Sequence, residues 1–229
     1  MEFSRVNKLR WSPLEYTERL EYKCKHSHNG ITHPSCFERE NDIQERIGIL
    51  DIETSNLDAD FGIILSWCIK EYGVEDNVEI GALTEKDIKN GTFDKRIVQD
   101  LITELWKYDR LVTHYGIKFD IPFIRTRAIV HGLNFPEYGM LWLTDTWMIS
   151  KKKLKLSSNR QTSIARAIQH EDIKTSIHPD EWLAIQFGNK KMRKEAMDYI
   201  IDHNLKDVIQ CEKNYELIRK YYHETRSSI

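Results

Sequence analysis

The sequence lacks any apolar run that approaches the roughly 20 residues of a membrane-spanning helix. Its first residues, Met1 to Trp11, are polar and basic and contain no apolar stretch typical of secretory signals. It has only five prolines and no low-complexity tract, so extensive disorder is not expected. These absences argue against a membrane protein or a membrane partner, and we expect a cytoplasmic location.

Cysteine is also scarce, and neither sign of charge dominates. Four cysteines in a cytoplasmic chain are expected to be reduced thiols or metal ligands rather than disulfides. The formal charge of −2 neither favours nor excludes a polyanionic partner. The chain of 229 residues is long enough for one main domain with its own hydrophobic core and a small appendage.

The hydrophobic pattern predicts an α/β fold preceded by a short segment of different character. Residues 1–45 are charged and are expected to form an irregular N-terminal appendage, and residues 46–229 are expected to form the folded domain. Three strands come first, and helices and strands then alternate. The expected strands cover residues 47–52, 63–70, 78–83, 111–115 and 141–148, and the main expected helices cover residues 97–106, 120–131 and 190–222.

Two carboxylates two positions apart end the first expected strand. Asp51 and Glu53 point to the same face of that strand, because side chains alternate between faces. Carboxylates beside buried apolar residues are costly, and a hard cation such as Mg²⁺ or Mn²⁺ offsets that cost. The pair therefore predicts a metal site, with a solvent-exposed strand end as the alternative.

Two later segments carry residues suited to the same site. Asp120 lies at an expected junction between a strand and a helix, where it serves either as a helix cap or as a ligand. His203 and Asp207 are four residues apart and share one face of the last helix. For this second pair, the alternative is an ordinary surface position.

These three segments, in this order, resemble the DEDD superfamily of 3′-to-5′ exonucleases, especially the branch similar to the proofreading domain of family B DNA polymerases. Asp51 and Glu53 match the first motif of that family, Phe119-Asp120 matches the second, and Asp207 matches the third. The resemblance implies an RNase H-like fold, with a mixed five-stranded sheet flanked by helices.

Two positions depart from the family pattern. The segment from His203 to Asp207 combines the histidine of one form of the third motif with the spacing of the other form. Tyr115 stands where the second motif commonly has asparagine. The first departure leaves the subclass open, and the second changes a contact that the asparagine would make to substrate or backbone.

The resemblance implies hydrolysis of phosphodiester bonds with the help of two Mg²⁺ or Mn²⁺ ions. Asp51, Glu53, Asp120 and Asp207 would be the ligands, and His203 would orient or deprotonate the attacking water. The implied function is a 3′-to-5′ exonuclease on nucleic acid, DNA rather than RNA, with a single-stranded 3′ end as its substrate. A replication or repair protein is a further implied partner. The alternatives are an endonuclease or ribonuclease of the same fold, and a catalytically silent module that binds nucleic acid.

Basic runs and tryptophans supply candidate substrate contacts. The basic residues either contact phosphates or belong to the solvated surface, and the tryptophans either stack on bases or pack in the core. The basic candidates are Lys151, Lys152, Lys153, Lys155, Arg160 and Arg166, followed by Lys190, Lys191, Arg193 and Lys194; the aromatic candidates are Trp142, Trp147 and Trp182.

A second group of candidate metal ligands lies in the N-terminal segment, within residues 24–36. Two sulfurs and two imidazoles satisfy tetrahedral Zn²⁺, and Asn29-Gly30 supplies a turn that folds the segment back. If residues 24–28 are extended, alternate side chains in them share a face. The segment predicts one structural zinc, with a polar loop or a nucleic-acid contact as the alternative. Its candidate ligands are Cys24, His26, His28, His33 and Cys36.

Overall fold

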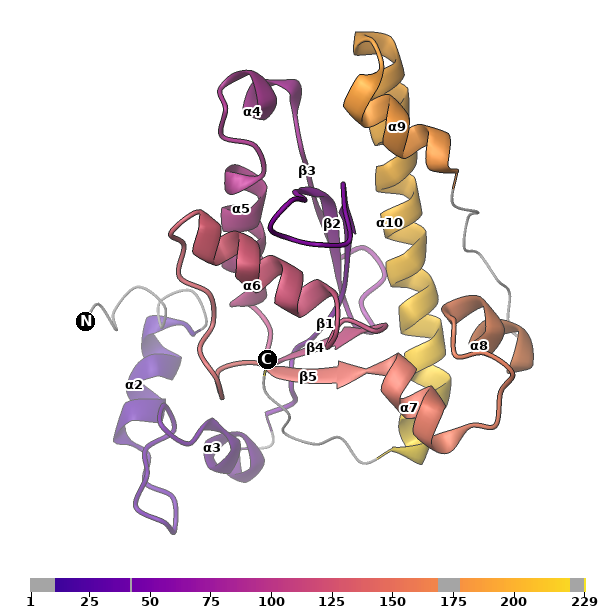
Figure 1. Cartoon of the computed structure of the whole chain (residues 1–229). Helices are drawn as coiled ribbons and strands as arrows, with labels where there is room; N and C mark the ends of the chain where they lie inside the picture. Colours follow the sequence, from indigo (N-terminus) through magenta and orange to yellow (C-terminus); the bar gives the residue numbers. More distant parts are fainter. Residues whose placement is uncertain (1–10, 42, 169–177, 223–228) are drawn as a thin grey trace.

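A computed structural model describes residues 11–41, 43–168, 178–222 and 229 of the chain. Its centre is a five-stranded sheet with the strand order β3-β2-β1-β4-β5 (Figure 1). The first three strands form an antiparallel meander, and β4 and β5 run parallel to β1. This mixed sheet confirms the predicted fold class. The strands are β1 Ile47–Thr54, β2 Ile64–Glu71, β3 Val78–Ala82, β4 Arg110–Thr113 and β5 Trp142–Asp145.

Helices cover both faces of this sheet. On one face α5 and α6 pack against it, and on the other the long helix α10 runs across β1 and β2 (Figure 1). Among the helices of the described residues, none combines the length and apolarity needed to cross a membrane. The helices of the domain are α4 Glu85–Lys89, α5 Lys95–Leu105, α6 Asp120–Val130, α7 Thr146–Lys153, α8 Gln161–Ala167, α9 Pro179–Phe187 and α10 Lys190–Ile218, and the 3₁₀ turn η1 Arg219–Tyr221 follows α10.

The alternation of side chains along β1 divides the core into two layers. Leu50 and Ile52 pack into the large apolar cluster that contains the buried residues of α5 and α6. Ile47 and Ile49 pack into a second cluster with Val208 and other residues of α10. The odd-numbered side chains of β1 therefore face α10, and this places Asp51 and Glu53 on the α10 side of the sheet.

Two element ends differ by three or more residues from those expected. The predicted strand 141–148 ends at Asp145, because the Asp145 carboxylate accepts the backbone N–H groups of Trp147 and Met148 and starts α7. The predicted last helix ends at Ile218 rather than Tyr222 and gives way to the 3₁₀ turn η1. The helix predicted over residues 120–131 is confirmed, and Gly132 follows it with φ +66°.

The described part of the N-terminal segment, residues 11–41, is not irregular, contrary to expectation. It contains two helices, α2 Pro13–Glu21 and α3 Pro34–Glu40, which a loop connects (Figure 1). Each begins with a proline, which is favoured in the first helical turn because its missing N–H is not needed there. Prolines that appear to interrupt a charged stretch therefore mark helix starts.

Candidate active site

The third motif lies on α10, opposite the end of β1. The Nε2 atom of His203 lies 3.8 Å from Oε1 of Glu53 and 3.9 Å from Oδ2 of Asp207. These three residues offer ligand atoms that all lie within 4.8 Å of one another. Because His203 and Asp207 are one turn apart, a single helix face brings both to the strand. The structure thus unites the first and third motifs.

Asp51 is held by the same helix through a residue that the sequence did not single out. Asn204 Nδ2 donates a hydrogen bond of 2.7 Å to Asp51 Oδ2, and Asn204 Oδ1 accepts one of 3.1 Å from Ser66 Oγ. Both Asn204 and Ser66 are fully buried. Asn204 therefore fixes the Asp51 side chain relative to α10, and no spacing rule identifies it within the motif.

Asp120 joins this group from the opposite layer. It is the first residue of α6, whose N-cap is Phe119, so it is not the helix cap that the sequence allowed. Asp120 Oδ1 accepts the backbone N–H of Ile52 at 3.1 Å, which connects α6 to the end of β1. The pKa of Asp120 is raised to about 7, because burial and the charges of Asp145 and Asp207 together outweigh the backbone hydrogen bonds that lower it.

Asp145 is a second residue that the sequence analysis missed. Beyond capping α7, its carboxylate accepts the backbone N–H groups of Tyr115 at 3.0 Å and Ile117 at 3.1 Å. Burial raises the pKa of Asp145, and the backbone hydrogen bonds oppose that shift. Asp145 therefore anchors the loop that leads from β4 to Asp120. The sequence analysis expected Asp145 to lie within a strand, and so did not predict this role.

The donor set suits a hard divalent cation. Asp51, Glu53, Asp120 and Asp207 supply carboxylate oxygens, which Mg²⁺ and Mn²⁺ prefer. Asp120 and Asp207 are buried, and burial together with the charges of Asp145 and Asp207 raises the pKa of Asp120. A bound cation would remove this electrostatic cost. The residues therefore fit the metal that the sequence predicts.

Aromatic side chains cover the histidine of the group. The ring of Tyr199 stacks on His203 with centroids 6.2 Å apart and planes 11° from parallel. Trp182, on α9, lies edge-on to the same imidazole at 6.2 Å and donates its Nε1 proton to the Thr54 carbonyl at 3.1 Å. His203 is thus 2% exposed and held in one orientation. Of the three tryptophans, Trp182 borders the site.

Tyr115 and Trp147 form a partly exposed aromatic pair where the loop approaches α7. Their rings meet edge to face at 5.1 Å, and Lys118 Nζ lies 5.7 Å from the first centroid and 5.2 Å from the second. Lys151 Nζ lies 4.7 Å from the Trp147 centroid. Tyr115 has φ +71°, a conformation that asparagine tolerates and bulky residues rarely adopt. An asparagine, the residue that the resemblance leads us to expect here, would adopt this conformation more readily than tyrosine does.

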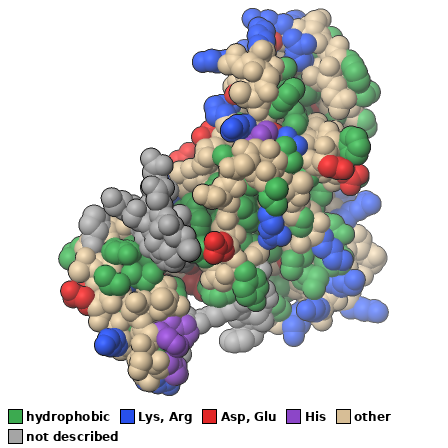
Figure 2. All heavy atoms as spheres, turned by 60° about the vertical axis from the view of Figure 1, so that its left-hand side comes forward, with side chains coloured by type: hydrophobic (Ala, Val, Ile, Leu, Met, Phe, Trp, Pro, Cys, Tyr) green, Lys and Arg blue, Asp and Glu red, His purple; other side chains and the backbone are tan. Residues whose placement is uncertain are grey.

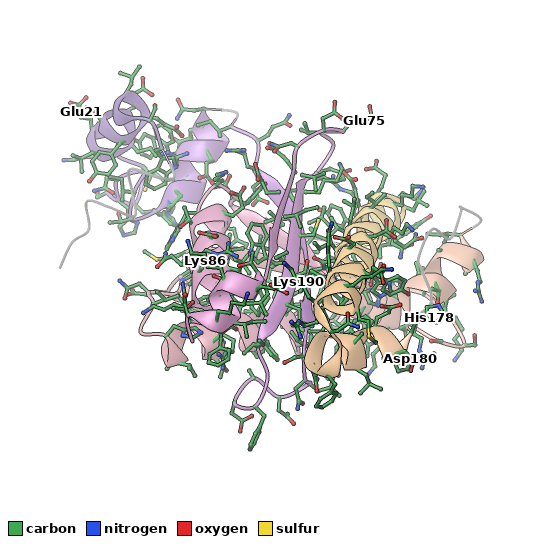
Figure 3. All side chains as sticks on the ribbon, turned by 90° about the horizontal axis from the view of Figure 1, so that it is seen from above. Glu21, Glu75, Lys86, His178, Asp180 and Lys190 are labelled. Carbon is green, nitrogen blue, oxygen red and sulfur yellow. The ribbon has the colours of Figure 1, made fainter. Side chains whose placement is uncertain are left out.

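The second basic cluster lies away from the carboxylates. Lys190 begins α10, thirteen residues and about 20 Å of helix before His203. Together with Lys191, Arg193 and Lys194 it lines a groove of about 700 Å³, whose apolar lining includes Leu83, Ile88, Ile185 and Met197. Figure 3 shows α4 and the start of α10, marked by Lys86 and Lys190, on either side of this groove. The remaining basic candidates, Lys152, Lys153, Lys155, Arg160 and Arg166, are exposed.

The candidate zinc ligands also converge, at the other end of β1 from the carboxylates. The stretch from Cys24 to His28 is not extended, as the sequence allowed, but is a turn closed by a Cys24 N–H bond of 2.9 Å to the His28 carbonyl. Ser27 has φ +66° within it. Figure 2 shows histidine side chains gathered on the surface of this segment.

Comparisons with known proteins agree with this architecture. A family model of the RNase H superfamily matches residues 49–219. A solved family B DNA polymerase from the hyperthermophilic archaeon Pyrobaculum calidifontis has a similar fold, with a TM-score of 0.57 and 13% sequence identity. The match covers 76% of this chain and 25% of the polymerase, so this chain spans only part of that protein's length. A search of curated proteins gives no match. The predicted RNase H-like fold and family B resemblance are confirmed.

Proposed function

The chain belongs to the RNase H superfamily, and we propose that it acts as a metal-dependent 3′-to-5′ exonuclease on nucleic acid. The family and the fold support hydrolysis of phosphodiester bonds. The direction of digestion is supported by the order of the three motifs, which resembles that of the proofreading exonucleases. Single-stranded DNA is the substrate that this resemblance favours.

The observation that carries the proposal is the convergence of side chains distant in sequence. Glu53, His203 and Asp207 meet within 4.8 Å, although about 150 residues separate the first from the other two. Asp51 and Asp120 are tied to the same point by hydrogen bonds from Asn204 and Ile52. Carboxylates gathered in this way, two of them buried, destabilise a fold unless a cation balances their charge, because each negative charge raises the cost of the next.

Each residue has a distinct task in the proposed reaction. Asp51, Glu53, Asp120 and Asp207 would hold two Mg²⁺ or Mn²⁺ ions, which activate water and stabilise the charge that develops on the phosphate when bound. His203 accepts a proton from the attacking water, and Glu53 and Asp207 on either side stabilise the resulting imidazolium. Tyr199 and Trp182 hold the imidazole in place and limit the access of bulk water.

The aromatic pair Tyr115 and Trp147 supports a nucleic-acid substrate. Tyr115 is exposed, and Lys118 and Lys151 lie beside the half-buried Trp147, so the pair offers base stacking together with phosphate contacts, the combination used by proteins that bind single strands. The pair lies next to the loop that Asp145 anchors and that leads directly into Asp120. Lys118 and Lys151 are therefore better placed to contact the strand near the cleaved bond than the distant Lys190 cluster.

Digestion of a 5′-labelled single-stranded DNA oligonucleotide tests the proposal, with an RNA of the same sequence alongside. We expect a ladder of shortening labelled products in Mg²⁺ or Mn²⁺, none with the Asp51→Ala variant, and weaker substrate binding with Lys118→Ala. Asp100→Ala, a change at an exposed position on α5, is the matched control and should digest normally.

Other outcomes of the same assay separate the alternatives. Internal cuts would replace the exonuclease with an endonuclease, and preferential digestion of the RNA would replace DNA as the substrate. Binding without cleavage in either metal would reduce the protein to a nucleic-acid-binding module. Equal activity of the purified Asp51→Ala variant would overturn the site itself.

A further inference from the structure

The loop between α2 and α3 brings two thiols and two imidazoles to the spacing of a tetrahedral metal site. Cys24 Sγ lies 3.8 Å from His26 Nδ1 and 3.9 Å from His33 Nδ1, and Cys36 Sγ lies 3.9 Å from His26 Nδ1. Sulfur and nitrogen atoms on one tetrahedral Zn²⁺ are separated by roughly 3.6 Å, given the usual bond lengths. These three separations therefore need a contraction of only a few tenths of an ångström.

The backbone of this loop determines the convergence. Ser27 N–H donates to the Cys24 carbonyl at 2.8 Å, and this turn brings His26 back over Cys24. Asn29 Oδ1 accepts the N–H groups of Ile31 and Thr32, so a second turn returns the chain toward α3. Cys36 lies in the first turn of α3, directly behind His33. The ligand positions are thus held by hydrogen bonds before any metal binds.

The described part of the segment is small, and its interior holds an ion-paired side chain. Residues 11–41 are fewer than the roughly 40 below which domains usually need a metal, a disulfide or a partner. Its interior is built around Arg19, which is 2% exposed and lies between the rings of Trp11 and Phe37 at 4.5 and 4.7 Å. Glu15 and Glu38 pair with the guanidinium of Arg19. An ion-paired arginine gives less net stability than an apolar side chain in that position.

We propose that this segment binds one Zn²⁺ through Cys24, His26, His33 and Cys36, and that the metal stabilises the packing of α2 against α3. Both thiols are buried, at 4% and 3% exposure, which suits a closed structural site. His28 also places a ring nitrogen within 4.8 Å of the first three ligands, and its side chain is exposed, as is that of His26. Zinc selects the buried thiolate of Cys36 over this fifth candidate, because thiolate is the softer ligand.

This site is separate from the carboxylate group, and the proposal does not rest on the nuclease assignment. The N-terminal segment joins β1 at Ile47, whereas Asp51 and Glu53 lie toward the opposite end of that strand. Mg²⁺ or Mn²⁺ prefers oxygen ligands, so the two sites select different metals. Zinc content and nuclease activity are therefore independent readouts.

The test is metal analysis of the full chain expressed with zinc and purified without chelator. We expect about one zinc per chain for the wild type and for His28→Ala, and at least about a fivefold lower content for Cys36→Ser. Replacement of zinc by Co²⁺ in the wild type provides a second reading that needs no variant. Two thiolates give a sulfur-to-cobalt charge-transfer band about twice as intense as one.

Each other result overturns a stated part of the proposal. Normal zinc in Cys36→Ser together with zinc loss in His28→Ala would make His28 the fourth ligand. A wild-type protein without zinc, whose Co²⁺ form shows no charge-transfer band, would exclude the site altogether. Thiol titration of the denatured wild type detects a disulfide between Cys24 and Cys36, which would also exclude it.

Discussion

Asp94 and Asp120 are two buried aspartates in the same core, and their surroundings are opposite. Asp94 is 0% exposed and Asp120 is 4% exposed, and each accepts the backbone N–H of a strand residue, Ile64 and Ile52 respectively. Asp94 also receives two hydrogen bonds from Arg127, at 2.8 and 2.9 Å, and lies 2.7 Å from His131 Nε2. Around Asp120, the charges of Asp145 and Asp207 are negative.

The pKa values follow this difference. Burial raises the pKa of Asp94, but the hydrogen bonds from Arg127, Ile64 and His131 outweigh it and lower the pKa overall. Burial and neighbouring acids raise the pKa of Asp120. The fold therefore pairs Asp94 with the guanidinium of Arg127, whereas it places other acids around Asp120. The first arrangement stabilises the domain, and the second is suited to a cation taken from solution.

Asp120→Asn should separate activity from stability and has the largest expected effect. Loss of a metal-binding carboxylate should lower the rate of oligonucleotide digestion at least about a thousandfold, which corresponds to about 4 kcal/mol. In chelator, the melting temperature should stay the same or rise, because the change removes repulsion among buried acids. Digestion rates and thermal unfolding, with Asp100→Asn as the matched exposed control, measure both quantities. A variant that loses stability and activity together would mean that Asp120 is structural.

Asp94→Asn should give the reverse pattern. The change leaves the buried guanidinium of Arg127 without its countercharge, and we expect a loss of about 3–5 kcal/mol in the free energy of unfolding. Activity per folded molecule should change little, because Asp94 contacts none of the proposed ligands. Urea unfolding and digestion rates test this. A loss below about 1 kcal/mol, the range of exposed ion pairs such as Asp100 with Arg96, would contradict it.

The smallest expected effect is the pH dependence of the loss in the free energy of unfolding that Asp94→Asn causes. Because the pKa of Asp94 is lower in the folded state, its contribution is fully present above the unfolded pKa of about 3.9 and is lost as the pH falls through the folded value. The stability difference between wild type and Asp94→Asn should therefore be constant near pH 7 and shrink below about pH 4. Urea unfolding at several pH values measures it, and a difference that grows on acidification would contradict the assignment.

The sequence predicted the fold well because each strand of the sheet has a strong local pattern. The run Ile47–Ile52 and the helical spacing of Ile97, Leu101 and Leu105 identify β1 and α5 without tertiary information. The pattern failed at Asp145, where apolar residues continue past the strand and one side-chain cap starts a helix. It also failed in the N-terminal segment, whose helices are short.

Only the site residues that belong to a sequence motif were predicted. Asp51, Glu53, Asp120, His203 and Asp207 were identified from residue type, order and resemblance. Asn204 and Asp145 were missed because their importance lies in long-range hydrogen bonds, to Asp51 across 153 positions and to Tyr115 across 30. A single sequence does not contain such pairings. The left-handed backbone conformation of Tyr115 was likewise not predicted, although the sequence analysis noted that tyrosine is unusual at this position.

The placement of His203 and Asp207 on α10 has a consequence for the timing of assembly. Synthesis proceeds from the N-terminus, so the sheet from β1 to β5 emerges from the ribosome before this helix does. Asp51 and Glu53 then lack the opposite half of the site until α10 docks across β1 and β2. In the proposed function, the nascent chain therefore lacks a complete metal-binding group, and the activity that depends on it, until its core has closed.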